Sequence, residues 1–234
     1  MNSRQKIIAI IPARGGSEGI PSKNIINICK KPLIAWSILH AKSTPEIHSV
    51  WVTSDSDEIL NIAQQYGANP IKRPENLSTS TASSESAWLH ALQEIEKILG
   101  AIDLVVGMQA TSPIREPSDI SMAIKNLINN EYDSLLSVSE LEDYFIWEVH
   151  NGNPMPVNYN KNDRKMRQSI NKSYLENGSF YIFKSSILKS ENNRLGGKMG
   201  IHLMDKHKMF QIDNKEDIKL CESIMRGYDL DKYE

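Results

Sequence analysis

The chain has 234 residues, with 27 Lys and Arg against 29 Asp and Glu, a formal net charge of -2 and 40% hydrophobic residues. Such a chain can bury a substantial core, and its balanced charge excludes an overall basic field for a nucleic-acid duplex. The longest apolar run, Ile7 to Ile11, is too short to span a bilayer, so no membrane partner is expected. Cys29 and Cys221 form no CxxC or Cys/His cluster, which favours a reduced, cytoplasmic protein.

The first 138 residues alternate between apolar runs typical of strands and stripes typical of amphipathic helices. The run Ile7–Ile11 is apolar at every position, as expected of a central strand that is buried on both faces. The predicted strands are 7–11, 50–52, 103–106 and 134–138, and the predicted helices are 33–39, 55–63, 88–99 and 117–128. This alternation predicts an α/β fold with a doubly wound parallel sheet.

The texture of the sequence changes between residues 139 and 176, where Asn, Gly and Pro interrupt any regular periodicity. We interpret this segment as an arm inserted into the α/β domain. Strand character returns at 180–183 and again at 201–204. A final helix is predicted over 215–225, with Ile218, Cys221 and Met225 facing inward.

A glycine-rich turn follows the first strand, with Gly15, Gly16 and Gly19 between Arg14 and Lys23. Free backbone N–H groups at such a turn can face an anion, and the two flanking cations could neutralise a polyphosphate. The spacing matches neither GxxxxGK[ST] nor GxGxxG. The alternative interpretation is a plain connecting loop whose charges are incidental.

This turn, IPARGGSEGIPSKNI at 11–25, resembles the opening motif of the acylneuraminate cytidylyltransferases, the family of CMP-sialic acid and CMP-legionaminic acid synthetases. Four further segments resemble the later motifs of that family, in the same order. They are 72–77 with 81–84, 108–115, 176–182 and 212–217. The resemblance implies a Rossmann-like, mostly parallel α/β fold of the nucleotide-diphospho-sugar transferase type. It also implies one cytidylyltransferase domain over 1–234, a dimerisation and sugar-binding arm at 139–176, and a homodimer.

The reaction implied by the resemblance joins CMP from CTP to the C2 hydroxyl of a nine-carbon 2-keto acid sugar, of the N-acetylneuraminate or legionaminate type, and releases pyrophosphate. Such chemistry needs positioning and charge neutralisation more than covalent help from the protein. The implied nucleotide-binding residues are Arg14, Ser17, Lys23, Asn24, Arg73 and Ser84; the implied sugar-binding residues are Gln109, Thr111, Ser112, Arg167 and Tyr181; and the implied catalytic residues are Arg14, Lys23 and Asp213. The cofactor implied is Mg²⁺, held on the Asp213 side. For Ser84 and Tyr181 the plainer alternatives are helix capping and packing.

Two residues depart from the motifs of the family. Glu18 stands where the family usually has lysine, which places an anion beside the expected triphosphate. Gln211 stands where the family usually has the first of two aspartates, so Asp213 alone remains as the expected metal carboxylate. Asp217 is interpreted as first-turn helix charge rather than as a metal ligand.

The sequence also leaves open two functions other than that of a synthetase. Asp55-Ser56-Asp57 imitates the DxD motif of metal-dependent glycosyltransferases, although Ser and Asp at that place are ordinary helix N-caps. A non-catalytic nucleotide-binding relative would explain the departures at Glu18 and Gln211.

The segment Asp143–Trp147 bears on the choice of sugar. It is more apolar than the sialic-type pattern, which favours legionaminate slightly. It could equally form part of a dimer core.

Overall fold

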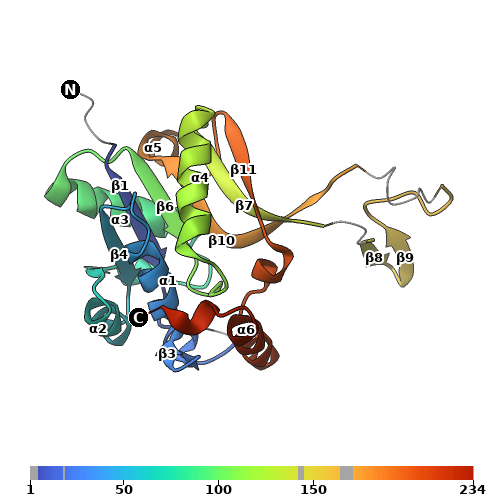
Figure 1. Cartoon of the computed structure of the whole chain (residues 1–234), viewed down its shortest axis with the longest axis horizontal. Helices are drawn as coiled ribbons and strands as arrows, with labels where there is room; N and C mark the ends of the chain where they lie inside the picture. Colours follow the sequence, from blue (N-terminus) through green and yellow to red (C-terminus); the bar gives the residue numbers. More distant parts are fainter. Residues whose placement is uncertain (1–4, 18, 142–144, 164–170, 234) are drawn as a thin grey trace.

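The computed structural model describes residues 5–17, 19–141, 145–163 and 171–233. Its core is a seven-stranded sheet with helices on both faces, and a long arm leaves one side of this body (Figure 1). In spatial order, the strands are β11 (Met199–Met204), β7 (Ser134–Glu140), β10 (Tyr174–Lys184), β6 (Leu104–Met108), β1 (Ile7–Pro12), β4 (Ser49–Ser54) and β5 (Asn69–Lys72). The helices are α1 (Leu33–Lys42), α2 (Asp57–Gln65), α3 (Ser84–Leu99), α4 (Pro117–Asn129), α5 (Ser185–Glu191) and α6 (Lys215–Gly227).

The predicted α/β class with a mostly parallel sheet is confirmed. β1 pairs in parallel with β4 and β6, β4 pairs in parallel with β5, and β7 pairs in parallel with β11. β10 is the exception, because it runs antiparallel to both β6 and β7. Its direction follows from the chain path: the chain leaves the sheet at the end of β7, builds the arm and returns, so that Tyr174 lies opposite Glu140.

The sheet separates two apolar layers, and β1 shows how its sequence serves both. Ala9 and Ile11 point into the layer formed with α1, α2 and α4, whereas Ile8 and Ile10 point toward α3 and α5. Successive side chains of a strand face opposite sides, so an unbroken apolar run suits a central strand covered on both faces.

A third apolar cluster attaches α6 to the body. Cys221 and Met225 of α6 are buried against Leu33 and Trp36 of α1, and Ile218 is partly buried beside them, as the helical pattern predicts. The cluster also reaches the small hairpin of β2 (Asn27–Ile28) and β3 (Lys31–Pro32). Because α6 is packed on the body in this way, the segment just before it, residues 211–214, also lies against the body of the domain.

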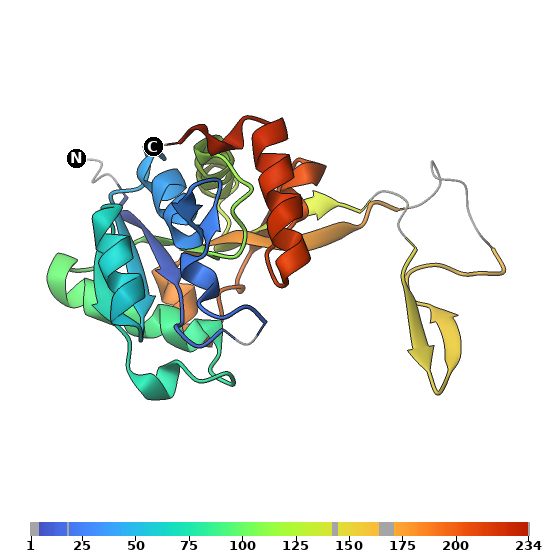
Figure 2. The ribbon, with the colours of Figure 1, turned by 90° about the horizontal axis from the view of Figure 1, so that it is seen from below.

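The arm stands clear of the body in two perpendicular views (Figures 1 and 2). It contains an antiparallel hairpin of β8 (Trp147–His150) and β9 (Asn153–Pro156), where no regular element was predicted. Asn151 and Gly152 form its turn with φ of 50° and 80°. An Asn-Gly pair is the strongest short hairpin signal, so this element was readable in the sequence. β7 and β10 extend a few residues into the range 139–176.

Neither β5 nor α5 was predicted, because the apolar content of each segment is low. β5 buries only Ile71, since it is an edge strand that begins with Asn69 and Pro70. The short helix α5 buries Leu188 and Ser185. Within the described part of the chain, no helix is both long and apolar enough to cross a membrane.

A buried lysine joins the region after β11 to the start of α4. Lys208 is 2% exposed, and its Nζ donates to both carboxylate oxygens of Asp119 at 2.9 Å and to Glu116 Oε2 at 3.0 Å. Burial alone would lower the pKa of Lys208, but the hydrogen bonds from Nζ to Asp119 and Glu116 raise it above the ordinary value. The ammonium group is therefore held in its charged form between two carboxylates.

Lys208→Met should lower the free energy of unfolding by about 3–5 kcal/mol, because it leaves the buried Asp119 carboxylate without its cation. Urea denaturation measures the loss, and the double variant Lys208→Met/Asp119→Asn should recover part of it. The exposed pair Lys97–Glu94 provides the matched control, since Lys97→Met should cause no resolvable loss. Equal stability of the Lys208 and Lys97 variants would contradict this account.

Candidate active site

A cleft of about 490 Å³ opens where several parallel strands end. Its walls are the loops that follow β1, β5 and β6, the first turn of α3, and the segment before α6. Of the residues expected to bind substrate, those that line the cleft are Arg14, Ser17, Lys23, Asn24, Arg73, Ser84, Gln109, Thr111 and Asp213. The carboxyl edge of a parallel sheet is where α/β proteins commonly bind ligands.

The glycine-rich loop after β1 is held by side chains from elsewhere. The Gly15 N–H donates to Asp55 Oδ1 at 3.0 Å, and Asn24 Nδ2 donates to the Arg14 carbonyl at 2.9 Å. At position 19, a Cβ atom would lie 2.7 Å from the Asp213 carbonyl oxygen, which only glycine avoids. The loop therefore lies directly against the backbone of the segment before α6.

The described residues that line the cleft include three cations, Arg14, Lys23 and Arg73, and one carboxylate, Asp213. Arg14 Nη1 donates to the Thr79 carbonyl at 3.3 Å, and Arg73 Nε donates to Ser78 Oγ at 2.9 Å. Burial lowers the pKa of Arg73, while Asp55, 3.8 Å from its guanidinium, opposes that shift. With Lys23 as the third cation, the excess positive charge suits an anionic ligand such as a polyphosphate.

The first turn of α3 adds a helix N-terminus to the cleft. Ser83 is the N-cap, and its Oγ accepts the Ser86 N–H at 3.2 Å. The capping alternative for Ser84 is therefore wrong, because the neighbouring serine has that role. The positive end of the helix dipole at this place is favourable to an anion.

Lys23, one of the expected catalytic residues, is paired within the cleft. Lys23 Nζ donates to Asp213 Oδ1 at 3.0 Å and to the Ile212 carbonyl at 3.1 Å, while the Asp213 side chain is 72% exposed. Asp217 accepts the N–H groups of Asp213 and Asn214, and these bonds lower the pKa of its carboxyl. The prediction that Asp217 belongs to the first turn of the helix is confirmed.

Gln211 forms a hydrogen bond with the backbone of β10. Its Nε2 donates to the Asn177 carbonyl at 2.8 Å, beside Gly178, whose φ of 64° is the left-handed conformation that glycine favours. A carboxylate has no N–H to donate, so an aspartate at position 211 could not make this bond. The departure at position 211 thus has a structural explanation.

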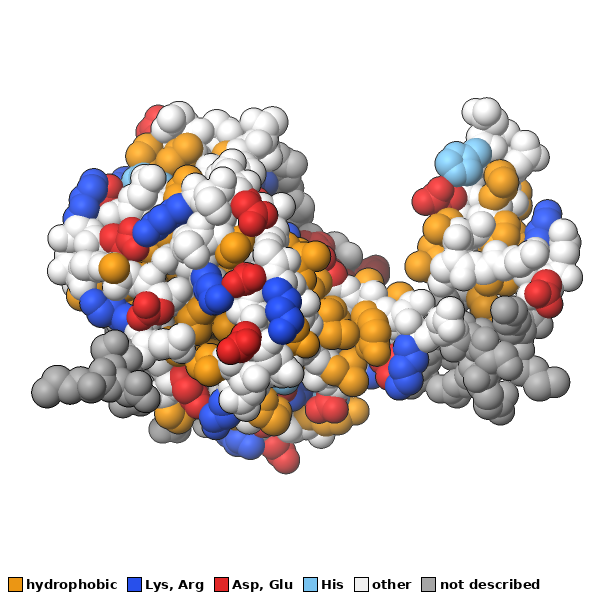
Figure 3. Space-filling view, turned by 90° about the horizontal axis from the view of Figure 1, so that it is seen from above, with side chains coloured by type: hydrophobic (Ala, Val, Ile, Leu, Met, Phe, Trp, Pro, Cys, Tyr) orange, Lys and Arg blue, Asp and Glu red, His pale blue; other side chains and the backbone are white. Residues whose placement is uncertain are grey.

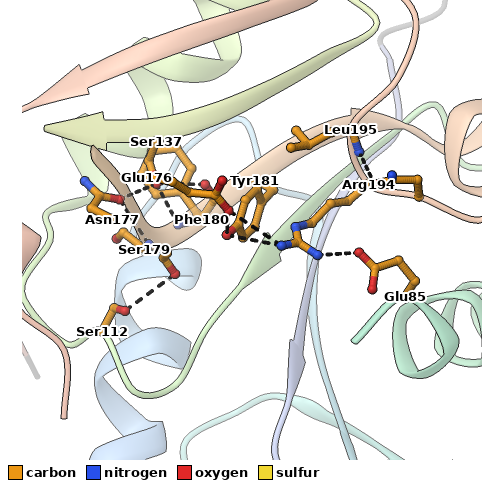
Figure 4. Close-up of polar contacts among 12 residues, drawn as sticks. Glu85, Ser112, Ser137, Glu176, Asn177, Ser179, Phe180, Tyr181, Arg194 and Leu195 are labelled. Atoms are coloured by element: carbon orange, nitrogen blue, oxygen red, sulfur yellow. Dashed lines mark hydrogen bonds and ion pairs between the residues drawn. The ribbon is translucent and has the colours of Figure 1, made fainter. Parts of the chain in front are cut away.

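Ser112 and Tyr181 are buried and are not among the described residues that line this cleft, so their expected sugar contacts stay a prediction. Tyr181 is 2% exposed; its hydroxyl donates to Glu176 Oε1 at 2.5 Å and accepts from Arg194 at 3.5 Å (Figure 4). Burial, and then the bond to Glu176, raise the pKa of Tyr181 to about 12. The buried Ser112 hydroxyl donates to the Gly178 carbonyl at 3.5 Å. Arg167 and Glu18 lie outside the described residues.

Figure 4 also shows an arginine for which the sequence predicted no role. The Arg194 guanidinium lies over the Tyr181 ring, 4.2 Å from its centroid, and pairs with Glu85 of α3 and with Glu176. Arg194 therefore links the helix that borders the cleft to β10. No local motif marks it, because its partners come from distant parts of the chain.

The Asp55-Ser56-Asp57 sequence does not form a metal-binding pair here. Asp55 holds the glycine-rich loop, Ser56 caps α2, and the exposed Asp57 pairs with Lys72 at 2.6 Å. In the part of the chain that the structure describes, no group of three or more His, Cys, Asp or Glu could hold a metal ion. The geometry therefore favours the capping interpretation over the glycosyltransferase motif.

The family model described as "Cytidylyltransferase" matches residues 8–233. The chain is 34% identical over 219 residues to N-acylneuraminate cytidylyltransferase A of Danio rerio, covering 92% of this chain and 50% of that protein, so it spans half that relative's length. It is 31% identical over 225 residues to the CMP-N,N'-diacetyllegionaminic acid synthase of Campylobacter jejuni, covering 94% of this chain and 95% of that protein.

Among solved structures, the fold resembles that of a CMP:2-keto-3-deoxy-manno-octonic acid synthetase complexed with CTP. The TM-score is 0.73, the sequence identity is 14%, and the match covers 96% of this chain and 100% of that chain. At this identity, the likeness concerns the fold.

Gly19→Ala should lower the free energy of unfolding by about 1–3 kcal/mol, because the new methyl group collides with the Asp213 carbonyl and neither backbone can move freely. Gly16→Ala, in the same loop, is the matched control. A Cβ there would meet nothing within 4 Å, so its effect should stay within about 0.5 kcal/mol. Urea denaturation compares the two variants, and equal losses would refute the close approach at Gly19.

Proposed function

The chain belongs to the cytidylyltransferase family, and on this premise we propose that it makes a CMP-activated nonulosonic acid from CTP and the free acid sugar. As a member of this family it is a nucleotidyltransferase. The observation that carries the proposal is the cleft in which the glycine-rich loop lies among Arg14, Lys23 and Arg73. A triphosphate needs this combination of close backbone approach and neutralising charge.

The reaction proceeds by positioning and charge neutralisation. Arg14, Ser17 and Lys23 bind the triphosphate, with Arg73 and Ser84 on the cytidine side. The C2 hydroxyl oxygen of the sugar attacks the α-phosphorus, the bond from that phosphorus to the bridging oxygen breaks, and the hydroxyl proton passes to solvent. Lys23 offsets the charge that grows on the departing pyrophosphate. Gln109 and Thr111 offer amide and hydroxyl groups to the sugar.

Mg²⁺ fits the cleft as a cofactor held partly by the substrate. Asp213 is an exposed carboxylate in the lining, and Mg²⁺ is commonly bound by one or two carboxylates together with substrate phosphates. When bound, the ion would neutralise phosphate charge. Asp213 would hold the ion, while Lys23, whose Nζ lies 3.0 Å from Asp213 Oδ1, would bind the triphosphate.

We infer that the active form is a homodimer in which the arm reaches a second copy. The arm extends away from the body of its own chain (Figure 1), and apolar side chains lie on it (Figure 3). The exposed large hydrophobic residues on the arm are Ile146, Trp147, Val149, Met155 and Val157. Residues of this kind, displayed on an extended hairpin, are typical of an interface with another protein surface.

Legionaminate is the proposed acid sugar. A tail that is deoxygenated and N-acetylated suits an apolar wall, and the described residues Phe145 and Trp147 form an aromatic cluster with Tyr159, with ring centroids 4.4 and 5.8 Å from it. The relative from Campylobacter jejuni is a CMP-N,N'-diacetyllegionaminic acid synthase. In the dimer, this cluster would face the cleft of the neighbouring copy.

We propose that the protein is located in the cytoplasm. The two free cysteines, Cys29 and Cys221, are buried, and burial raises the pKa of both thiols, so neither is a reactive thiolate. Fractionation of cells that express the tagged chain tests the location; recovery outside the cytosol would contradict it.

Pyrophosphate release should require CTP, Mg²⁺ and an acid sugar together, and should be fastest with di-N-acetyllegionaminate among that acid, N-acetylneuraminate and di-N-acetylpseudaminate. A coupled pyrophosphate assay measures the rate, and mass spectrometry of the nucleotide identifies the CMP-sugar. Faster turnover of another acid would overturn the choice of legionaminate. No release with any acid sugar would contradict the synthetase function.

Lys23→Met separates catalysis from folding in the same assay. Turnover should fall by at least about 100-fold, because the charge that stabilises the leaving group is lost. The melting temperature should stay close to that of the original chain, since the lost partner, Asp213, is largely exposed. A large fall in melting temperature would instead assign Lys23 a structural role.

Sedimentation equilibrium should give twice the mass of one chain. Trp147→Glu with Val149→Glu should shift the protein to monomer, because two charges then replace exposed apolar side chains of the arm. The matched control is Leu220→Glu, at an exposed apolar position on α6, which should leave the mass unchanged. A monomeric original chain would contradict the dimer.

A further inference from the structure

The loop after β6 forms one wall of the cleft without regular secondary structure. Residues 109–116 are neither helix nor strand, yet Gln109 and Thr111 in this loop must keep fixed orientations if they are to bind a substrate. A backbone outside helices and sheets still needs partners for its buried polar groups. The orientation of the wall therefore depends on where the carbonyl groups of this loop find their donors.

Those donors come from three separate parts of the chain. Arg115 Nη2 donates to the Gln109 carbonyl at 2.6 Å, and Ser37 Oγ of α1 reaches the same oxygen at 3.3 Å. The Thr111 carbonyl accepts the Ile212 N–H at 2.8 Å. The Ser112 carbonyl accepts Arg115 Nε at 3.0 Å and is also bonded by Nη2. Arg115 is thus the one residue that holds two of these three carbonyls.

Arg115 is an unusual residue for this place. Its side chain is fully buried, and its Nη1 finds no hydrogen-bond partner among the residues that the structure describes. Burial lowers the pKa of its guanidinium to about 9, and the charge of Asp119 opposes that shift. Burying a cation whose hydrogen bonds go to neutral carbonyls costs free energy. If position 115 served only to fill the core, an apolar side chain would do so without that cost. The value of Arg115 must lie in the donors it presents.

We propose that Arg115 is a positioning residue for the acid-sugar side of the cleft: its guanidinium fixes the carbonyls of Gln109 and Ser112, and thereby the orientation of Gln109 and Thr111. Arginine suits this task because its planar fork donates in two directions at once, whereas the lysine ammonium acts as a single point. The proposal rests on the proposed function only in naming the acid sugar as the substrate that contacts this wall of the cleft.

Arg115→Lys keeps the positive charge but cannot hold both carbonyls in the same geometry. It should raise KM for the acid sugar by about 10- to 100-fold, because small misplacements of binding groups are costly, while KM for CTP changes less than about threefold. The matched control is Arg226→Lys, an exposed arginine at the end of α6, which should leave both constants unchanged. Equal rises in the two KM values would overturn the proposal, as would no change in either.

A second readout does not depend on turnover. Hydrogen exchange followed by mass spectrometry should show faster exchange at residues 109–112 in Arg115→Lys than in the original chain, with exchange in α3 unchanged. Unchanged exchange at 109–112 would refute the anchoring role.

Arg115→Gln gives a second test should the lysine variant fold poorly, because it is uncharged and can still donate to one carbonyl. The same local exchange should then be faster. If the original chain released no pyrophosphate, the proposed function would fail, while the exchange data would still decide the role of Arg115.

Discussion

The parallel pairing of β1 with β4 and β6 is the constraint on which the cleft depends. It brings the chain out of the sheet at one common edge after each strand, so that the glycine-rich loop, Asp55 and Gln109 come together although they are far apart in sequence. The loops that result have little regular structure. Their shape is held by side-chain to backbone bonds, of which those made by Asn24 and Gln211 are examples.

Charge in the cleft is balanced with few groups. Lys23 and Asp213 neutralise one another, while Arg14 and Arg73 supply the excess of positive charge. Asp55 lies behind Arg73 and anchors the glycine-rich loop, so one carboxylate both steadies a cation and fixes the backbone. This arrangement lets a site for a polyanion exist in a protein whose net charge is -2.

The sequence was informative where a single local pattern decides the structure. Apolar runs located most central strands, and the motif residues Arg14, Lys23 and Gln109 indeed line one cleft. It was less informative where distant contacts decide. The register of β10 shifts between Glu176 and Tyr181, beside the left-handed Gly178, and such a shift changes which way side chains face. Tyr181 therefore lies in the core, and the roles of Arg115 and Arg194 depend on partners that no local pattern reveals.

The pairing of Lys23 with Asp213 joins positions 190 residues apart, and this separation has a consequence for the order of assembly. β1, β4 and β6 can pair early, but β10 can join them only after the arm has been made, and the segment against Gly19 arrives later still. Closing such long loops is entropically costly and slow. On a ribosome, the growing chain would therefore have the glycine-rich loop long before it had a completed cleft, and competence to bind a ligand would be acquired only after residues 211–214 had emerged.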